Sequence, residues 1–147
     1  MLELPSAVLF CCTMNAIRSP MAEGLMKRLH GKRIYVQSVG VRKGEFDPFA
    51  LVVMDEIGID ISRHRPRVFE ELDDGSFDVV ISLSPEAQHK AVELTRTSAS
   101  EVEFWNTFDP SLVEGNRDTR LEAYRAVRDQ LERQILKRFP TPRLARE

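Results

Sequence analysis

Short apolar segments alternate with amphipathic helical patterns along the chain, and this order limits the folds available to it. Residues 7–11 are continuously apolar, as is typical of a strand buried on both faces of a sheet. Weaker strand candidates follow at residues 33–38, 77–83 and 102–105. Strands separated by helices are joined by crossovers and run parallel. The pattern predicts an α/β fold, a doubly wound four-stranded parallel sheet with helices on both faces.

Helices are expected between and after these strands. Residues 19–30 place apolar side chains on one face, and residues 48–57 follow Asp47, a residue type that caps helix N-termini. A Ser-Pro-Glu sequence at 84–86 indicates the start of another helix. The longest, residues 118–139, repeats apolar residues at steps of three and four. That apolar stripe is expected to pack in the core and not to form a binding surface.

Length and composition indicate one domain over residues 1–147. Hydrophobic residues make up 42% of the 147, so the chain can bury a core without disulfides or metals. The formal net charge of −2 argues against a dedicated nucleic-acid binder, which usually has a strong basic excess. No spacing of His, Cys and Asp residues suggests a metal site, and no cofactor is expected. Small anions or proteins are the expected partners.

The cysteines and the N-terminus indicate a cellular compartment. Cys11 and Cys12 are the only cysteines and are neighbours, so they cannot form the disulfide framework of a small secreted protein. The N-terminal residues lack the basic region and apolar run of a signal peptide, and no segment approaches the ~20 apolar residues of a membrane span. We therefore expect a cytoplasmic protein without a membrane partner.

The segment from Cys12 to Ser19 carries the main functional signal. Cys12 ends the first apolar strand, and Arg18 stands six positions later at the start of an amphipathic helix. At such a junction backbone N–H groups converge and the helix dipole favours an anion. The residues expected to wrap around a tetrahedral oxyanion of phosphorus or arsenic are Thr13, Met14, Asn15, Ala16 and Ile17, with Ser19 following them.

Cys12 is interpreted as a nucleophile. A free cysteine has a pKa of about 8.5, and a helix N-terminus with an adjacent guanidinium can lower that pKa by several units. Arg18 offers paired donors to two equatorial oxygens, which a lysine would reproduce poorly. Ser19 can donate a hydrogen bond to the thiolate. In the alternative interpretation both cysteines only end a buried strand and Arg18 is solvated, and for Cys11 this interpretation is kept.

Further motifs accompany this loop in a fixed order. They are residues 8–23 as strand, loop and helix, Ser38-Val39-Gly40, Gly58-Ile59-Asp60-Ile61 followed by His64, Phe77-Asp78-Val79-Val80-Ile81, and Asp109-Pro110 after Trp105. Taken together, they resemble the low-molecular-weight protein-tyrosine phosphatase family, which shares its fold with a group of arsenate reductases. The resemblance covers nearly the whole chain and places a phosphate loop after the first strand.

The resemblance implies a phosphatase that hydrolyses phosphotyrosine in proteins or small aryl phosphates. Cys12 displaces the phenolate and forms a cysteinyl-phosphate while Asp109 protonates the leaving oxygen, and water then attacks with Asp109 as base. A phenolate leaves much better when protonated, which is a physical reason for a carboxyl there. The plainer interpretation of Asp109 is a helix cap or turn residue. Asn15 and Ser38 match family positions that support the loop, and asparagine tolerates a left-handed backbone.

Two positions in the loop depart from the family pattern. Met14 stands where many members have glycine, so the loop either keeps an ordinary backbone angle there or presents a thioether at the pocket rim. Ile17 replaces a second loop cysteine, which removes the usual oxidation partner of Cys12. A protective disulfide could then form only with Cys11, in a strained vicinal link.

The surroundings of the loop differ as well. Ser111 and Leu112 stand where many family phosphatases carry aromatic residues that flank the substrate ring. Phe46 and Phe108 are candidates for such a wall. A basic cluster formed by Arg63, His64, Arg65 and Arg67 is expected to structure a loop or meet solvent and not to bind substrate.

Two other functions remain open from the sequence. Arsenate reduction would use Cys12 in the same loop, with electrons from thiols. Relatives coupled to thioredoxin relay a disulfide through further cysteines that this chain lacks, so the reductant would be a small thiol such as glutathione. A non-catalytic module that binds phosphorylated proteins is the third hypothesis. It predicts the loss of Cys12, Arg18 or Asp109, and all three are present.

Overall fold

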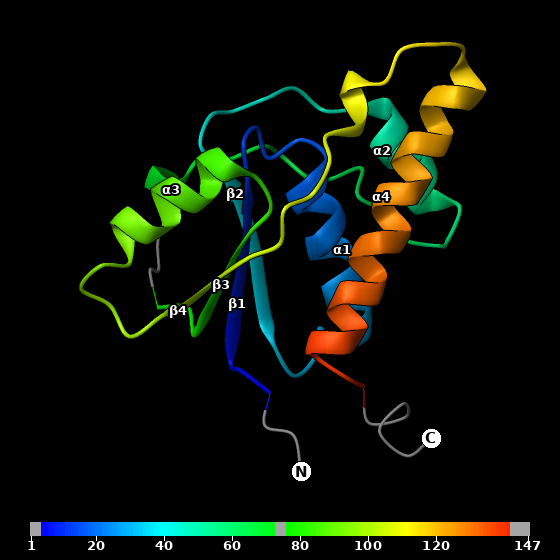
Figure 1. The fold of residues 1–147 in the computed structure, drawn as a ribbon. Coiled ribbons are helices and arrows are strands. Elements are labelled where there is room, and N and C mark those ends of the chain that lie inside the picture. Colours follow the sequence, from blue (N-terminus) through cyan, green and yellow to red (C-terminus); the bar gives the residue numbers. More distant parts are fainter. Residues whose placement is uncertain (1–3, 73–75, 142–147) are drawn as a thin grey trace.

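A computed structural model of the chain describes residues 4–72 and 76–141, and it contains the expected parallel sheet (Figure 1). The strands are β1 (Ala7–Cys12), β2 (Tyr35–Gly40), β3 (Val79–Ser82) and β4 (Glu101–Phe104), in the spatial order β2-β1-β3-β4. Every neighbouring pair is parallel. The predicted four-stranded parallel α/β fold is therefore confirmed, although the outer strands are shifted by one or two residues.

Helices cover both faces of this sheet, as predicted. α1 (Arg18–His30), α2 (Pro48–Asp55) and α4 (Arg117–Arg138) contribute to one apolar core, while α3 (Pro85–Leu94) packs on the other face. Figure 1 shows α3 on one side of the strands and α1 with α4 on the other. Two short 3-10 turns, Phe69–Glu71 and Pro110–Leu112, lie in the connections. Among the described residues, no helix has the length and apolar character needed to cross a bilayer.

The continuous apolar run of β1 follows from its central place in the sheet. Alternate residues of a strand point to opposite faces. Val8, Phe10 and Cys12 belong to the core under α1 and α4, whereas Leu9 and Cys11 belong to the core under α3. Both faces are covered, so both sets are apolar. The two neighbouring cysteines therefore point to opposite sides of the sheet.

The predicted helix caps are present. The Oδ1 atom of Asp47 accepts hydrogen bonds from the backbone N of Phe49 at 2.9 Å and of Ala50 at 3.1 Å. Ser84 caps α3 by accepting from the backbone N of Ala87 at 3.2 Å. α2 ends at Asp55, earlier than the predicted residue 57, because the chain turns there and reaches Gly58, whose φ of 78° favours glycine. These caps fix where the connecting loops begin.

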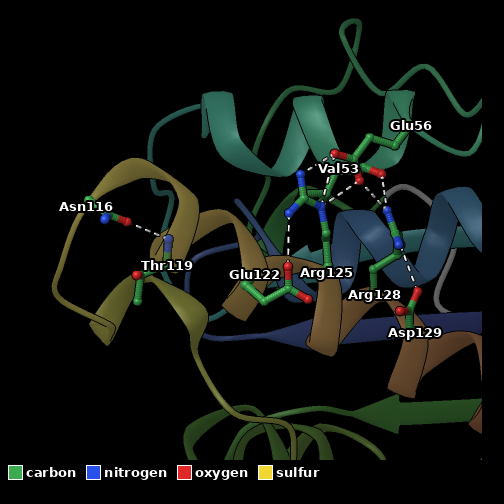
Figure 2. A network of polar contacts seen from close by, with 8 residues as sticks. All are labelled: Val53, Glu56, Asn116, Thr119, Glu122, Arg125, Arg128 and Asp129. Atoms are coloured by element: carbon green, nitrogen blue, oxygen red, sulfur yellow. Dashed lines mark hydrogen bonds and ion pairs between the residues drawn. The ribbon is translucent and has the colours of Figure 1, made fainter.

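An ionic network joins α4 to the C-terminal end of α2 (Figure 2). The guanidinium of Arg125 binds the Glu56 carboxylate at 2.7 Å, and that of Arg128 binds it at 2.8 Å. Arg128 also donates to the carbonyl of Val53 at 2.7 Å. The hydrogen bond from Arg125 is the main cause that lowers the pKa of Glu56 to about 2. The network holds α2, and hence the loop before it, against α4.

Candidate active site

The loop after β1 opens into a cavity of about 410 Å³ at the carboxyl end of the sheet. Ligands bind at this end in open parallel sheets. The lining residues are Cys12, Met14, Ala16, Ile17, Arg18, Lys43, Gly44, Glu45, Asp47, Asp109 and Ser111. Thus the structure brings Asp109, from a distant part of the sequence, to the cavity that Cys12 and Arg18 line. A larger cavity of about 820 Å³ lies where β2 begins, at the other end of the sheet, and contains none of these residues.

Four of the residues selected from the sequence do not line this cavity: Thr13, Asn15, Ser19 and Ser38. Their side chains support the loop from behind. The hydroxyl of Thr13 donates to that of Ser84 at 3.0 Å, which ties the loop to the start of α3. Asn15, Ser19 and Ser38 are buried, and the side-chain amide of Asn15 donates to the hydroxyls of both serines.

Ser19 is the direct partner of the Cys12 sulfur. Its Oγ atom lies 2.9 Å from Sγ of Cys12 and accepts a hydrogen bond from Nδ2 of Asn15 at 2.8 Å. The other acceptor near this hydroxyl, the carbonyl of Val39, is farther away at 3.5 Å. Because Asn15 is a donor to Ser19, the single hydroxyl hydrogen is available for the sulfur. A thiolate at Cys12 would be stabilised by that bond.

Asn15 fixes the shape of the loop. Its φ of 54° is the only positive φ of a non-glycine residue in the described chain. Its side chain donates to Ser38 at 2.9 Å and accepts from the backbone N of Arg67 at 2.8 Å. Nε2 of His64 donates to the backbone oxygen of Asn15 at 2.8 Å. Two members of the basic cluster, His64 and Arg67, thus structure the loop, which is one of the two roles predicted for the cluster.

Residues 41–44 lie along the loop and continue the pairing of β1 with β2. The backbone N of Arg42 donates to the carbonyl of Thr13 at 2.9 Å, and that of Gly44 to Met14 at 2.9 Å. This close approach requires glycine at position 40, where a Cβ would lie 2.7 Å from the Asn15 nitrogen. Met14 has no positive φ and is 43% exposed, so it occupies the rim with an ordinary backbone.

The positive end of α1 faces the loop. Ile17 stands at its N-cap and makes no side-chain capping hydrogen bond. The first N–H groups of the helix are therefore available to an anion. Arg18 is the first residue of α1, and its Nη1 atom donates to the carbonyl of Thr107 at 3.0 Å. This contact ties Arg18 to the loop that carries Asp109.

Asp109 is placed on the cavity wall by the connection after β4. The backbone N of Thr107 donates to the carbonyl of Leu83 at 3.0 Å, so this connection stays beside the end of β3. Oδ1 of Asp109 accepts from the backbone N of Ser111 at 3.0 Å and from its hydroxyl at 2.7 Å. The carboxylate is thus held in one orientation by its own turn. Asp109 is both a turn cap and a cavity residue.

Four exposed apolar residues either line the cavity or adjoin its lining residues in the sequence. Met14 lines the cavity and is 43% exposed. The others are Phe46 (42% exposed), next to Asp47, Phe108 (55%), next to Asp109, and Leu112 (70%), next to Ser111. A small inorganic anion gains nothing from such a rim. An organic group attached to the anion, or a second organic reactant, would bury it.

Cys11 is separated from this chemistry. Its thiol is fully buried on the opposite face of the sheet and donates to the carbonyl of Ile81 at 3.6 Å. Burial is the main cause that raises the pKa of Cys11, with a smaller contribution from Cys12. The vicinal disulfide considered from the sequence would require one of the two side chains to cross the sheet. Both cysteines are free thiols in this structure.

Lys43, Glu45 and Asp47 were not selected from the sequence as cavity residues. Only Asp47 gave a local signal, as a helix cap, and its Oδ2 atom also accepts from the hydroxyl of Tyr124 at 2.9 Å. Lys43 pairs with Glu71 at 3.1 Å. Their presence in the cavity depends on how loop 41–47 folds over the β1 loop. Within the described ranges, no group of three His, Cys, Asp or Glu side chains could hold a metal ion.

A parallel sheet with a Cys- and Arg-containing loop between its first strand and first helix defines a class of proteins that bind tetrahedral oxyanions. The profile of the low molecular weight phosphotyrosine protein phosphatase family matches residues 7–147. The chain belongs to this family, as the sequence motifs indicated.

Individual relatives include enzymes with two different names. The chain is 34% identical over 128 residues to the glutaredoxin arsenate reductase of Synechocystis sp., which covers 87% of this chain and 92% of that protein. A solved arsenate reductase in the phosphate binding state is 32% identical with a TM-score of 0.69, covering 90% of this chain and 95% of that one. The low molecular weight protein tyrosine phosphatase from T. tengcongensis is 29% identical with a TM-score of 0.74, covering 90% and 96%.

Proposed function

We propose that this chain is an arsenate reductase that takes its electrons from a small thiol. The observation that carries the proposal is the setting of Cys12: its sulfur lies in an anion cavity with Arg18, and the chain has no second cysteine on that side of the sheet. The curated relatives named arsenate reductase support the reaction. Because Cys11 is buried behind the sheet, the second thiol must come from outside the chain.

In the first step the Cys12 thiolate attacks the arsenic atom of arsenate. Arg18 and the free N–H groups of α1 bind the remaining oxygens. An As–S bond forms and one oxygen leaves as water after protonation. We assign that proton to Asp109, a carboxyl that lines the same cavity. Ser19 stabilises the sulfur while it is a thiolate.

In the second step an external thiolate attacks the sulfur of Cys12. The new S–S bond forms as the S–As bond breaks, and the electron pair stays on arsenic, which is reduced from As(V) to As(III) and leaves as arsenite. A second small thiol then releases Cys12 from the mixed disulfide. In sum, arsenate and two thiols give arsenite, one disulfide and water. A reducing compartment such as the cytoplasm would supply the thiol.

The apolar rim favours a second candidate, hydrolysis of aryl phosphates including phosphotyrosine. Phe46 and Phe108 are exposed and adjoin the cavity residues Asp47 and Asp109 in the sequence, and in this reaction they would contact an aromatic group whose phosphate is bound by the loop. Cys12 would form a cysteinyl-phosphate, Asp109 would protonate the phenolate, and water would complete the reaction with Asp109 as base. The solved tyrosine phosphatase relative supports this chemistry on the same fold.

The two functions separate in one set of assays. Purified protein is given arsenate with glutathione or dithiothreitol, and arsenite is measured; the same protein is assayed for hydrolysis of p-nitrophenyl phosphate. The proposal predicts arsenite formation that is lost in Cys12→Ser and kept in Cys11→Ala. Phosphate ester hydrolysis without arsenite formation would establish the second candidate. Binding of phosphate with neither reaction would leave the non-catalytic module.

A further inference from the structure

A second cavity lies behind the anion loop. It measures about 360 Å³ and shares no lining residue with the cavity at Cys12. Its walls come from the exposed side of α1, from Gln37 of β2 and from residues 60–67. This segment contains the basic cluster of Arg63, His64, Arg65 and Arg67, which takes no part in the proposed reaction.

The lining of this rear cavity is positively charged. Four cationic side chains, those of Lys27, Arg63, Arg65 and Arg67, face two carboxylates. Both carboxylates are already engaged. Glu23 binds Lys27 at 2.5 Å and accepts from the hydroxyl of Ser38 at 2.5 Å. Asp60 accepts from the backbone N of Ser62 at 2.8 Å.

Two of the guanidinium groups have donors to spare. Within residues 4–72 and 76–141, the Arg63 side chain makes no hydrogen bond or ion pair. Its charge acts on the Asp60 carboxylate, whose pKa is lowered mainly by hydrogen bonds from Ser62 and to a smaller extent by Arg63. That of Arg65 reaches only the carbonyl of His64, at 3.3 Å. A guanidinium carries five N–H donors in a planar fork that fits phosphate oxygens. The rear cavity therefore combines excess positive charge with unused donors.

The wall of the rear cavity is bonded directly to the anion loop. His64 donates to the backbone oxygen of Asn15, and the backbone N of Arg67 donates to its side-chain oxygen, both at 2.8 Å. Glu23, which also lines the rear cavity, accepts a hydrogen bond from Ser38, and Ser38 in turn accepts one from Asn15. Asn15 thus stands between the two cavities. A ligand that fixes residues 63–67 would also fix the loop around Cys12.

We propose that the rear cavity is a binding site for a small polyanion, such as a diphosphate or a metabolite with closely spaced phosphates. Arg63 and Arg65 bind its charged oxygens, and the site is coupled to the anion loop through His64, Arg67 and Asn15. Since coupling between two binding sites is reciprocal, an occupied rear cavity strengthens oxyanion binding at Cys12, and an oxyanion there strengthens rear binding. The site would regulate the enzyme whichever of the two reactions it catalyses.

Inorganic pyrophosphate is the probe, and its binding to the front loop must first be weakened. Calorimetric titration at fixed ionic strength is therefore done in an Arg18→Ala background. We expect pyrophosphate to bind at one site in this background. Adding Arg63→Gln with Arg65→Gln should weaken that binding about tenfold or more. Lys32→Gln with Arg33→Gln, in the larger basic cavity, should leave it unchanged. No binding in the background, or equal binding with and without the Arg63 and Arg65 changes, overturns the proposal.

A second background and a second readout keep the test decisive. Carboxymethylation of Cys12 places a negative group in the front loop while retaining Arg18, and rear binding should persist. Hydrogen exchange of this carboxymethylated protein, with and without pyrophosphate, then tests the coupling between the two cavities. Pyrophosphate should slow exchange of the Arg67 amide, which donates to Asn15, and of residues 14–16. Protection confined to residues 63–65 would contradict the coupling to the loop.

Discussion

The hydroxyl oxygen of Ser19 lies 2.9 Å from the sulfur of Cys12 and receives a hydrogen bond from the Asn15 amide on its other side. This arrangement orients the hydroxyl hydrogen toward the sulfur. The side chains of Ser19 and Asn15 are fully buried behind the loop, and neither lines the cavity. The hydroxyl of Ser19, the second residue of α1, is therefore the group that supports the Cys12 nucleophile.

Removing that oxygen should slow the chemistry of Cys12. In Ser19→Ala we expect alkylation of Cys12 by iodoacetamide at pH 7 to fall about tenfold, because a hydrogen bond to a charged group contributes about 1.5–3 kcal/mol. Cys11 lies in the core under α3 and does not line the cavity, so it should not react in either protein. The exposed Ser98→Ala is the control. An unchanged alkylation rate in Ser19→Ala would show that the hydroxyl does not stabilise the thiolate.

Asn15 should matter more for stability than its position in a loop suggests. Asn15→Gly keeps the backbone with φ of 54° but loses the buried side-chain bonds to Ser19, Ser38 and Arg67. We expect it to lower the free energy of unfolding by about 2–3 kcal/mol. Asn15→Ala should lose about 1 kcal/mol more, because alanine disfavours the left-handed region.

Urea unfolding monitored by circular dichroism measures both changes. The helix cap Asn116→Ala is a matched control, because it removes one exposed bond to the backbone N of Thr119 and should cost about 1 kcal/mol. If Asn15→Gly and Asn15→Ala were equally stable, the backbone conformation of Asn15 would contribute nothing to the loop.

The sequence was sufficient for the features that are local. The apolar run of β1, the Cys12 to Ser19 loop and the start of α1 are all set by residues within one short segment. Capping by Asp47 and Ser84 could also be predicted, because a cap binds backbone only two or three residues away. These features needed no knowledge of the rest of the fold.

Contacts between distant segments could not be predicted from the same patterns. The sequence predicts that His64 structures a loop or meets solvent, but it does not identify the partner, Asn15, which lies 49 residues away. Lys43 enters the cavity only because loop 41–47 folds over the β1 loop. Arg128 is a charged residue outside the apolar stripe of α4, yet it is only 9% exposed because Glu56 and the carbonyl of Val53 in α2 satisfy it. The periodicity of a helix predicts which of its faces is buried, but it does not predict which residues of other segments contact that face.

Asp109 should reveal its role through the leaving group. Under the second candidate function, hydrolysis of aryl phosphates, Asp109→Asn should lower the rate with phenyl phosphate by roughly 10²–10⁴-fold, because the phenolate then leaves unprotonated. The loss should be much smaller for p-nitrophenyl phosphate, whose leaving group needs less protonation. Asp118→Asn, in the first turn of α4, is the control. Equal losses for both esters would exclude Asp109 as the general acid.

Glu56 connects stability to pH. Its carboxylate is shared by Arg125 and Arg128, and its pKa is about 2 compared with an ordinary value of 4.5. A pKa that is lower in the folded state means that folding favours the charged form. The stabilisation is therefore complete above pH 4.5 and is lost as the pH falls from 4.5 toward 2.

Glu56→Gln should accordingly lower the free energy of unfolding by about 1–2 kcal/mol at pH 7, since the nearly buried Arg128 loses a charged partner. Urea unfolding between pH 7 and pH 3 measures the difference between wild type and variant, which should shrink as the pH falls below 4.5. Glu122→Gln, which removes only an exposed partner of Arg125, should cost less than about 0.5 kcal/mol. A difference for Glu56→Gln that stays constant down to pH 3 would mean that the ion pairs do not carry its effect.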